Sequence, residues 1–352
     1  MSRGPAQEVT IRPVDAAELG PLLRGHPEIT RQMQQPSFFV TADWFDAVLS
    51  VTAPTDAWVL GLYDNASLVG LLPLERRKNR LGGMDLRFLG YQYYPDPLGL
   101  ICSVERLKPS IAAVMRFLRD RQDWQRVVLN FLIPEEAALW DPAFRQQSVS
   151  PRLALHEDFD ALLAGFGKKK RYKIRSAMRS AAKAGARFHA AEDGKARLDW
   201  LGQLFDLHAA RSATMGRSST LVDARLQQVH RALAGHSPSA KVFALRIGET
   251  PIAMLYGFLH HDRFAYYQVA HDPDYDRLGP GAVLLAHVIE WCCENGVPVF
   301  DFLQGNEDYK YRWADSVQPL AQATVVADRP LALGVNRLER MGVSIRSWLR
   351  RP

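Results

Sequence analysis

A short loop of small residues, Leu278-Gly279-Pro280-Gly281, comes directly before an apolar stretch with helical spacing. Small residues let a ligand approach the backbone, and the unpaired amides of a first helical turn form an anion site. Arg277 is the one positive side chain of the loop and aspartates precede it, so backbone amides would be the principal donors. The loop could bind a diphosphate, although Gly-Pro-Gly before a helix is more often only a turn.

Other side chains in the same half of the chain could transfer protons or bind a charged substrate. Asp301 lies in the apolar sequence FDFLQG, where burying an acid is costly unless the acid has a function or a structural partner. His208, in LFDLHAAR, titrates near neutral pH and suits a general base, although a single helical histidine is usually structural. Lys310 could contact an anionic substrate and Glu307 could orient an amine, but both are otherwise ordinary solvated residues.

The spacing of apolar residues predicts the elements that carry these side chains. Three antiparallel strands joined by tight turns, then a helix and a last strand, are expected at residues 242–246, 252–259, 264–269, 281–295 and 297–303. The last strand must return beside the third. This half is therefore expected to form a mixed α/β sheet that opens where those two strands diverge.

A chain of 352 residues is long enough for two domains. The first half is expected to contain a hairpin at 57–74, a helix at 108–121 and a buried strand at 126–132, with a linker at 134–151. We therefore expect domains at 1–151 and 152–330, followed by a basic amphipathic helix at 331–352.

The net charge of +6 comes from one segment. Nine cations and no acid lie between Lys168 and Arg187, and the remainder has 35 cations against 38 acids. This predicted helix could bind a substrate or cofactor through residues such as Arg171 and Lys173. It could instead bind RNA, an anionic membrane surface or an acyl carrier protein, or simply be a solvated face.

Several classes of protein are not indicated. No run of about 18 apolar residues predicts a membrane span, and the N-terminal residues lack the apolar core of a secretory signal. Three cysteines cannot form a disulfide framework, so a cytoplasmic location is expected. No spacing of cysteine and histidine indicates zinc, and no group of carboxylates indicates a required metal.

Five segments in order give the chain a family likeness: KKKRYKIRSAMRSAAKAG, LFDLHAAR, FALRIGETPIAMLYGF, YYQVAHDPDYDRLGPG and FDFLQGNEDYKYRWA. Across residues 159–321 the chain resembles the CelD-like acetyltransferases, named for cellulose biosynthesis, within the GNAT superfamily. It is also similar to the Fem-type peptidoglycan aminoacyltransferases, which carry two such domains in tandem. A fainter likeness covers the first half through SFFVTADW, VGLLPLERR and FLGYQYYPDPLG.

The resemblance implies a tandem pair of GNAT-like domains, the first degenerate and the second catalytic. The pantetheine arm of an acyl-CoA would pair with the third strand near Val269 and Ala270, and the pyrophosphate would lie on Gly279, Gly281 and Ala282. An amine would attack the thioester directly, and Tyr309 would protonate the departing thiolate.

The implied function is acyl transfer from acyl-CoA, or a related thioester, to an amine of a sugar, peptide or small metabolite. Two alternatives remain open at this point: a Fem-like transferase that depends on aminoacyl-tRNA, and an inactive binding component of a polysaccharide-assembly system.

Overall fold

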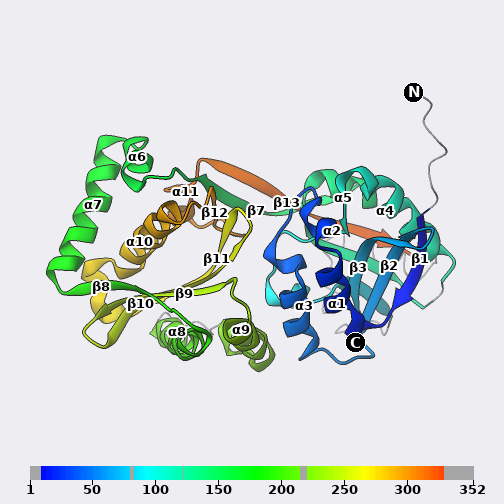
Figure 1. Cartoon of the computed structure of the whole chain (residues 1–352), viewed down its shortest axis with the longest axis horizontal. Helices are drawn as coiled ribbons and strands as arrows, with labels where there is room; N and C mark the ends of the chain where they lie inside the picture. The colour runs from blue at the N-terminus through cyan, green and yellow to red at the C-terminus, as the bar shows by residue number, and fades with distance from the viewer. Residues whose placement is uncertain (1–8, 80–82, 122, 215–219, 329–352) are drawn as a thin grey trace, which may run out of the picture. The chain divides into compact units, whose positions relative to one another are not determined.

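A computed structural model describes residues 9–79, 83–121, 123–214 and 220–328 (Figure 1). The chain divides into two compact units, unit 1 with Met1–Ser148 and Pro319–Pro352, and unit 2 with Val149–Gln318. The units differ from the expected domains in that the strand after residue 318 belongs to unit 1. The helix predicted at 331–352 lies outside the described residues.

Unit 1 contains a mixed sheet with the strand order β1-β2-β3-β4-β6-β13, in which β4 and β6 are parallel. Its strands are β1 (Val9–Val14), β2 (Ala57–Asp64), β3 (Ser67–Lys78), β4 (Met84–Phe88), β6 (Arg126–Leu132) and β13 (Ser316–Val326), with β5 (Ile101–Cys102) beside β3. Its helices are α1 (Leu19–Gly25), α2 (Pro27–Arg31), α3 (Ala42–Leu49), α4 (Val104–Arg119) and α5 (Pro134–Trp140). The hairpin, the helix and the buried strand predicted for this half are all present, although α4 begins several residues earlier than expected.

The stretch at 134–151 is not the linker that its mixed composition suggested. It contains α5, and most of it after residue 144 belongs to strand β7 (Arg145–Ala154). Pro134 opens α5 at a position where its missing N–H costs nothing, and the buried Ala137 and Trp140 anchor the helix. A segment of this length shows too few periodic positions to reveal a helix and a strand in sequence.

In unit 2 the strands follow one another in the order β7-β12-β11-β10-β9-β8. The other strands are β8 (Ala186–Ala190), β9 (Ala240–Ile247), β10 (Thr250–His260), β11 (Arg263–His271) and β12 (Val299–Asp301). Its helices are α6 (Phe159–Ala164), α7 (Lys168–Lys183), α8 (Gly194–Thr214), α9 (Ala224–His236), α10 (Pro280–Glu294) and α11 (Asp308–Tyr311), and a 3-10 helix, η5 (Pro273–Leu278), leads into α10. The mixed sheet expected from the sequence is therefore confirmed.

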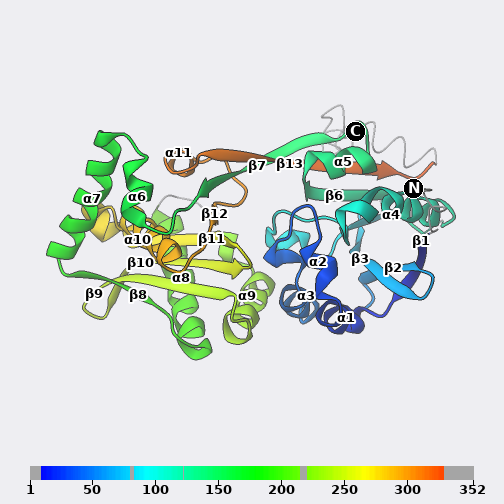
Figure 2. The same ribbon diagram turned by 45° about the horizontal axis from the view of Figure 1, so that its top comes forward.

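The two faces of this sheet are covered by different helices. Figures 1 and 2 show α8 and α9 on one face and α10, with α6 and α7 beyond it, on the other. The apolar stripe of α7, which includes Ile174, Met178 and Ala181, packs against the cluster of buried residues that α10 contributes. The remaining sides of α7 are polar, so the helix is held by one face only.

The central strands part at a defined point. β11 runs parallel to β12 only from Arg263 to Ala265, and the last paired residues are Ala265 and Asp301. We call this point the fork. Beyond it β11 continues to His271 beside β10 alone, as the predicted opening of the sheet requires.

A β-bulge lies just beyond the fork. Gly257 of β10 faces Tyr266 while Tyr256 faces Gln268, which leaves Tyr267 as the extra residue. A Cβ at Gly257 would lie 2.5 Å from the carbonyl oxygen of Ala265, so only glycine allows this close approach. A bulge bends its strand and increases the local twist. The bulge follows directly after the last residue of β11 that pairs with β12.

None of the helices in the described residues combines the length and the apolar character that crossing a bilayer requires. Cys102, Cys292 and Cys293 are all buried free thiols.

Candidate functional site

The fork is held by a fully buried carboxylate. Asp301 accepts hydrogen bonds at Oδ1 from Ser150 Oγ at 2.6 Å and from the Leu303 amide at 2.9 Å. At Oδ2 it accepts from Arg152 Nε at 2.9 Å and from an Arg263 guanidinium nitrogen at 3.4 Å. One side chain thus ties together β7, β11 and the end of β12.

These contacts explain why an acid lies in this apolar strand. A buried carboxylate is stable when it is paired with cations and hydrogen-bonded, and Asp301 has both kinds of partner. Taking a substrate proton would remove the charge that the two arginines face. The geometry therefore favours the structural role that the sequence left open, and we do not propose Asp301 as the general base.

Tyr309 lies next to the fork. Its hydroxyl donates to the hydroxyl of Tyr266, the first residue of β11 beyond the fork, at 3.3 Å, and the two rings meet edge to face. Burial raises the pKa of Tyr309 to about 12 and raises the pKa of Tyr266 well above its usual range. Both hydroxyls are protonated at neutral pH, which a proton donor requires.

A buried lysine shapes the turn that carries Tyr309. Lys310 is only 4% exposed, and its Nζ donates to the carbonyl oxygen of Gln304 at 2.6 Å and pairs with Glu307 at 3.1 Å. Gly305 has φ 137°, and a Cβ there would meet both charged groups. Lys310 and Glu307, both expected to contact substrate, pair with each other in this turn, where Lys310 is buried and Glu307 is exposed.

The loop before α10 leaves space at one glycine and is tightly packed at another. Gly279 is left-handed with φ 61°, and no atom lies within 4 Å of where its Cβ would be. A Cβ at Gly281 would lie 3.1 Å from His271 Nδ1, and His271 Nε2 lies 3.0 Å from Asp276. The glycine therefore lets the last residue of β11 lie against the start of α10.

Some of the backbone amides at the start of α10 already donate hydrogen bonds within the chain. The amides of Ala282 and Val283 both donate to the carbonyl oxygen of Gly279, at 3.0 Å each, and Pro280 has no N–H. Within the described part of the chain, no backbone acceptor is found for the Gly281 amide. An anion here would bind mainly to that amide and to the positive end of the helix. Arg277 is exposed on η5, close in sequence to the helix start.

Val269 and Ala270 lie on the free part of β11. They pair with Leu255 and Met254 of β10 on one edge, while the pairing with β12 has already ended at the fork. Ala270 is buried and Val269 is half-buried. Their outer backbone edge has no neighbouring strand from β12, and the Val269 carbonyl oxygen there accepts from the side-chain amide of Gln268 at 3.3 Å.

Helix α8 packs against β11 and carries two titratable side chains, His208 and Arg211. His208 is half-buried, and burial together with the charge of Arg211 lowers its pKa, so it is neutral at pH 7. Burial is the larger cause of the lowered pKa of His271, and the charge of Arg211 lowers it further. The charge of Arg211 also acts to lower the pKa values of Tyr266 and Tyr309, where burial outweighs it. Sequence reasoning missed Arg211, although it stands three residues after His208 in LFDLHAAR.

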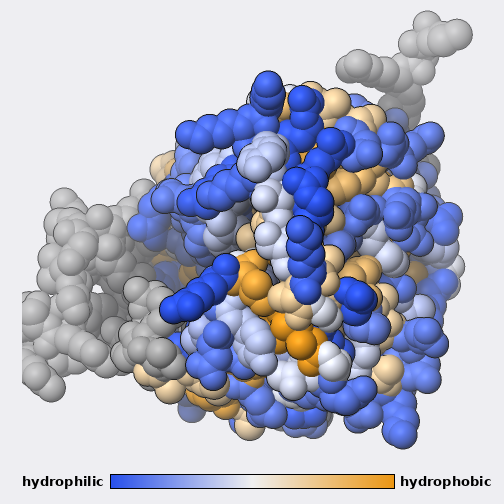
Figure 3. Space-filling view, turned by 90° about the vertical axis from the view of Figure 1, so that its left-hand side faces the viewer, coloured by the Kyte–Doolittle hydropathy of each residue, from blue (hydrophilic) through white to orange (hydrophobic). Residues whose placement is uncertain are grey.

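Helix α7 presents most of its cations to solvent. Lys173 is exposed, Arg171 is half-buried, and Arg175 pairs with Asp160 at 2.6 Å. Lys170 differs because its Nζ lies 3.0 Å from the centre of the Phe166 ring. Figure 3 looks onto the side of the molecule where α7 lies and shows hydrophilic side chains over much of it.

No group of three or more potential metal ligands is found among the described residues.

Comparisons with known proteins concern the fold and one domain of the chain. Residues 168–311 match the family model of the acetyltransferase (GNAT) domain. The fold is similar to that of FemX, with a TM-score of 0.64 and 11% identity over 89% of this chain and 98% of that chain. A tandem GNAT protein from the clavulanic acid biosynthesis pathway gives 0.50 and 11% over 92% and 99%.

A third similar structure is L-PGS from Bacillus licheniformis, with a TM-score of 0.52 and 13% identity over 77% of this chain and 85% of that chain. No match was found among curated proteins. At these identities the structures establish the fold alone, a tandem GNAT-like α/β architecture, and the residues that match the GNAT domain model, 168–311, lie in unit 2.

We expect Asp301→Ala to lower the free energy of unfolding by about 3 kcal/mol, because two arginines lose their shared buried partner. Denaturant unfolding followed by fluorescence measures this change. Asp308→Ala removes an exposed acid from the same region and should change stability by less than about 0.5 kcal/mol. Equal effects of the two substitutions would show that Asp301 does not hold the fork.

Proposed function

We propose that unit 2 transfers an acyl group from an acyl-CoA, or a related thioester, to an amine. The observation that carries this proposal is the fork, because it leaves the outer edge of residues 266–271 without a neighbouring strand from β12. The match of residues 168–311 to the GNAT domain supports the same donor class. The family resemblance of the sequence, to CelD-like acetyltransferases, points in this direction as well.

The donor would extend along β11 to the start of α10. Its pantetheine amides would pair with the backbone near Val269 and Ala270, and its diphosphate would lie at Gly279, Gly281 and Ala282. The open space at Gly279 suits close approach of a phosphate. Pro280 fixes the start of the helix, and the exposed Arg277 adds a positive charge nearby.

The reaction requires a nucleophile, a proton acceptor and a proton donor. The amine nitrogen forms a bond to the thioester carbon, the C–S bond breaks, and the thiolate takes the proton of Tyr309, which the phenolate then regains from solvent. His208 is the proposed acceptor of the amine proton because its lowered pKa leaves it neutral at pH 7. Direct attack needs no acyl-enzyme, in keeping with the inert, buried cysteines.

The acceptor class is proposed more broadly, as an amine on a sugar, peptide or small metabolite. The free thiols suit a reducing compartment, so we place the reaction in the cytoplasm. The cations of α7, including Arg171 and Lys173, would attract an anionic acceptor or an acyl carrier protein that presents the thioester.

A second candidate function is aminoacyl transfer from aminoacyl-tRNA. It is favoured by the exposed cations of α7, which suit RNA phosphates, and by the resemblance to Fem-type transferases. A third is an inactive binding component of a polysaccharide-assembly system. The three candidate functions differ in the donor that would bind at the start of α10, which is an acyl-CoA for the first, an aminoacyl-tRNA for the second and neither for the third.

Acetyl-CoA, free CoA or a long-chain acyl-CoA should raise the unfolding temperature of the full chain. A ligand at about 100 times its dissociation constant stabilises the folded state by roughly 2.7 kcal/mol, which thermal unfolding readily detects. Ala282→Asp should weaken this binding at least about tenfold, since it puts a carboxylate where the diphosphate would lie.

Ala224→Asp is the matched control, because Ala224 is an exposed residue in the first turn of α9. It should leave acyl-CoA binding unchanged. Equal binding by both variants would place the cofactor elsewhere. No binding of any CoA species, with binding of aminoacyl-tRNA, would replace the proposal by the second candidate.

Tyr309→Phe should lower kcat about 100-fold with little change in donor affinity, because only the proton for the leaving thiolate is lost. Thiol release from acetyl-CoA in the presence of a panel of amines measures the rate. The raised pKa keeps Tyr309 protonated, so the wild-type rate should not fall through loss of this proton below about pH 11.

Tyr311→Phe provides the comparison. Tyr311 lies on the same short helix and donates to Asn306 at 2.6 Å, at an exposed position. Its rate should stay within about twofold of the wild type. A Tyr309→Phe enzyme that is equally fast would remove Tyr309 from the mechanism.

A further inference from the structure

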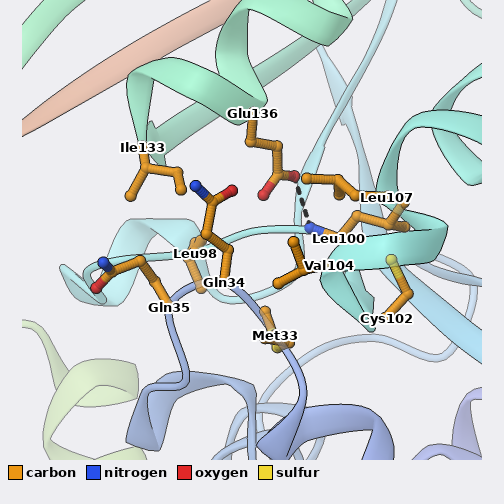
Figure 4. A pocket seen from close by; sticks show the side chains of 10 residues that line it. All are labelled: Met33, Gln34, Gln35, Leu98, Leu100, Cys102, Val104, Leu107, Ile133 and Glu136. Carbon is orange, nitrogen blue, oxygen red and sulfur yellow. Dashed lines mark hydrogen bonds between the residues drawn. The ribbon is translucent and has the colours of Figure 1, made fainter.

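A narrow pocket in unit 1 has room for a group about the size of a water molecule (Figure 4). Glu136 in its wall already accepts hydrogen bonds from the Leu100 amide at 2.8 Å and from Trp140 Nε1 at 3.2 Å. A space of this size suits an ordered water molecule and is too small for a substrate. The pocket therefore belongs to the packing of unit 1.

A fully buried histidine in unit 2 packs against the strands beside the fork. His230, on α9, has its Nε2 2.9 Å from the hydroxyl of Tyr267 on β11. Its Nδ1 lies 3.4 Å from the hydroxyl of Tyr256 on β10. The imidazole thus links α9 to one tyrosine on each of two neighbouring strands.

The imidazole of His230 is neutral, because burial lowers its pKa to about 3. In a neutral imidazole one nitrogen donates and the other accepts. A phenol is a stronger acid than a neutral imidazole N–H, and an imidazole nitrogen is a stronger base than a phenol oxygen. In the shorter contact the Tyr267 hydroxyl therefore donates to Nε2, and the proton of the ring lies on Nδ1, which faces Tyr256.

This direction of donation makes the Tyr267 oxygen an acceptor. A hydroxyl that donates its proton keeps its lone pairs for an N–H group. The Tyr267 side chain is half-buried, whereas Tyr256 is sealed in the core. His230 thus fixes the orientation of a hydroxyl that reaches the surface of the core.

Tyr266 and Tyr267 contact opposite faces of the sheet directly beyond the fork. Tyr266 belongs to the buried cluster that includes α10, and its hydroxyl meets that of Tyr309, whereas Tyr267 meets His230 of α9. His208, the proposed acceptor of the amine proton, is on α8, which covers the same face as α9 (Figures 1 and 2). A thioester on the free edge of β11 would have the proton donor for its sulfur on one face and the acceptor of the amine proton on the other. The amine is therefore expected on the face of Tyr267.

We propose that the Tyr267 hydroxyl accepts a hydrogen bond from the N–H group of the acceptor amine, and that His230 is the positioning residue that holds this hydroxyl. The proposal rests on the proposed acyl-transfer function and names the group that recognises the acceptor. Because its proton is already donated to His230, the hydroxyl does not donate to a carboxylate. The site therefore selects amines over acids.

Equilibrium binding of D-glucosamine, ethanolamine and glycinamide to the full chain tests the proposal without turnover. Saturation-transfer NMR of each amine, with and without free CoA, measures the affinity. At least one of these amines should bind saturably, and Tyr267→Phe should weaken that binding at least about tenfold, as loss of a hydrogen bond to a charged group does. Tyr63→Phe is the matched control and should have no effect, because Tyr63 is a half-buried tyrosine beside the bulge between β2 and β3 in unit 1.

Substitutions of His230 separate a positioning role from a structural one. His230→Leu should weaken amine binding about fivefold, whereas His230→Gln, whose amide oxygen accepts near the place of Nε2, should stay within about twofold of the wild type. The double variant of Tyr267→Phe and His230→Leu should bind no more weakly than Tyr267→Phe alone, because it has no hydroxyl left to orient. A histidine that only stabilises the fold would give additive losses.

The imidazole 15N signals of the wild-type protein give a readout that needs no ligand. Nε2 of His230 should be unprotonated and Nδ1 protonated at pH 7. A protonated Nε2, unchanged amine affinity in Tyr267→Phe, additive losses in the double variant, or no saturable binding of any of the amines would each overturn the proposal. Failure of acetyl-CoA to stabilise the chain would count against the CoA donor alone, because amine binding is also measured without CoA.

Discussion

The rest of unit 2 depends on the contacts that the Asp301 carboxylate makes at the fork. Three strands meet where its two oxygens are shared among Arg152, Arg263 and Ser150. The pairing of β11 with β12 ends at this residue, and the bulge around Tyr267 follows directly after it. The ion pairs of Asp301 and the unpaired edge of β11 therefore lie next to each other at the fork.

The elements around the free edge of β11 are held by separate local interactions. Lys310 closes the turn that positions Tyr309 against Tyr266, and Gly281 lets His271 lie against the start of α10. Arg211 brings a positive charge to the same groups from α8. A proton donor, a helix terminus and an open strand edge are the parts that direct acyl transfer from a thioester needs.

Strands β9, β10 and β11 and helix α10 could be predicted from the sequence because their apolar periodicity is local and strong, whereas β7 lies partly in the stretch expected to be a linker and β8, α6 and α9 were not predicted. The partners of Asp301 could not be predicted, since Ser150 and Arg152 lie about 150 positions away in the chain and only the folded sheet brings them together. The burial of Lys310 could not be predicted either, because it depends on carbonyl groups of an irregular turn. The return of residues 319–326 to unit 1 likewise left no periodic signal.

Hydrogen exchange of the backbone amides, with and without acetyl-CoA, tests the central claim most directly. If the donor pairs with the free edge of β11, the amides of residues 266–271 and the Gly281 amide should exchange at least about tenfold more slowly in the complex, while α4 in unit 1 should not change. Protection confined to other parts of the chain, or no protection at all at saturating acetyl-CoA, would contradict the account.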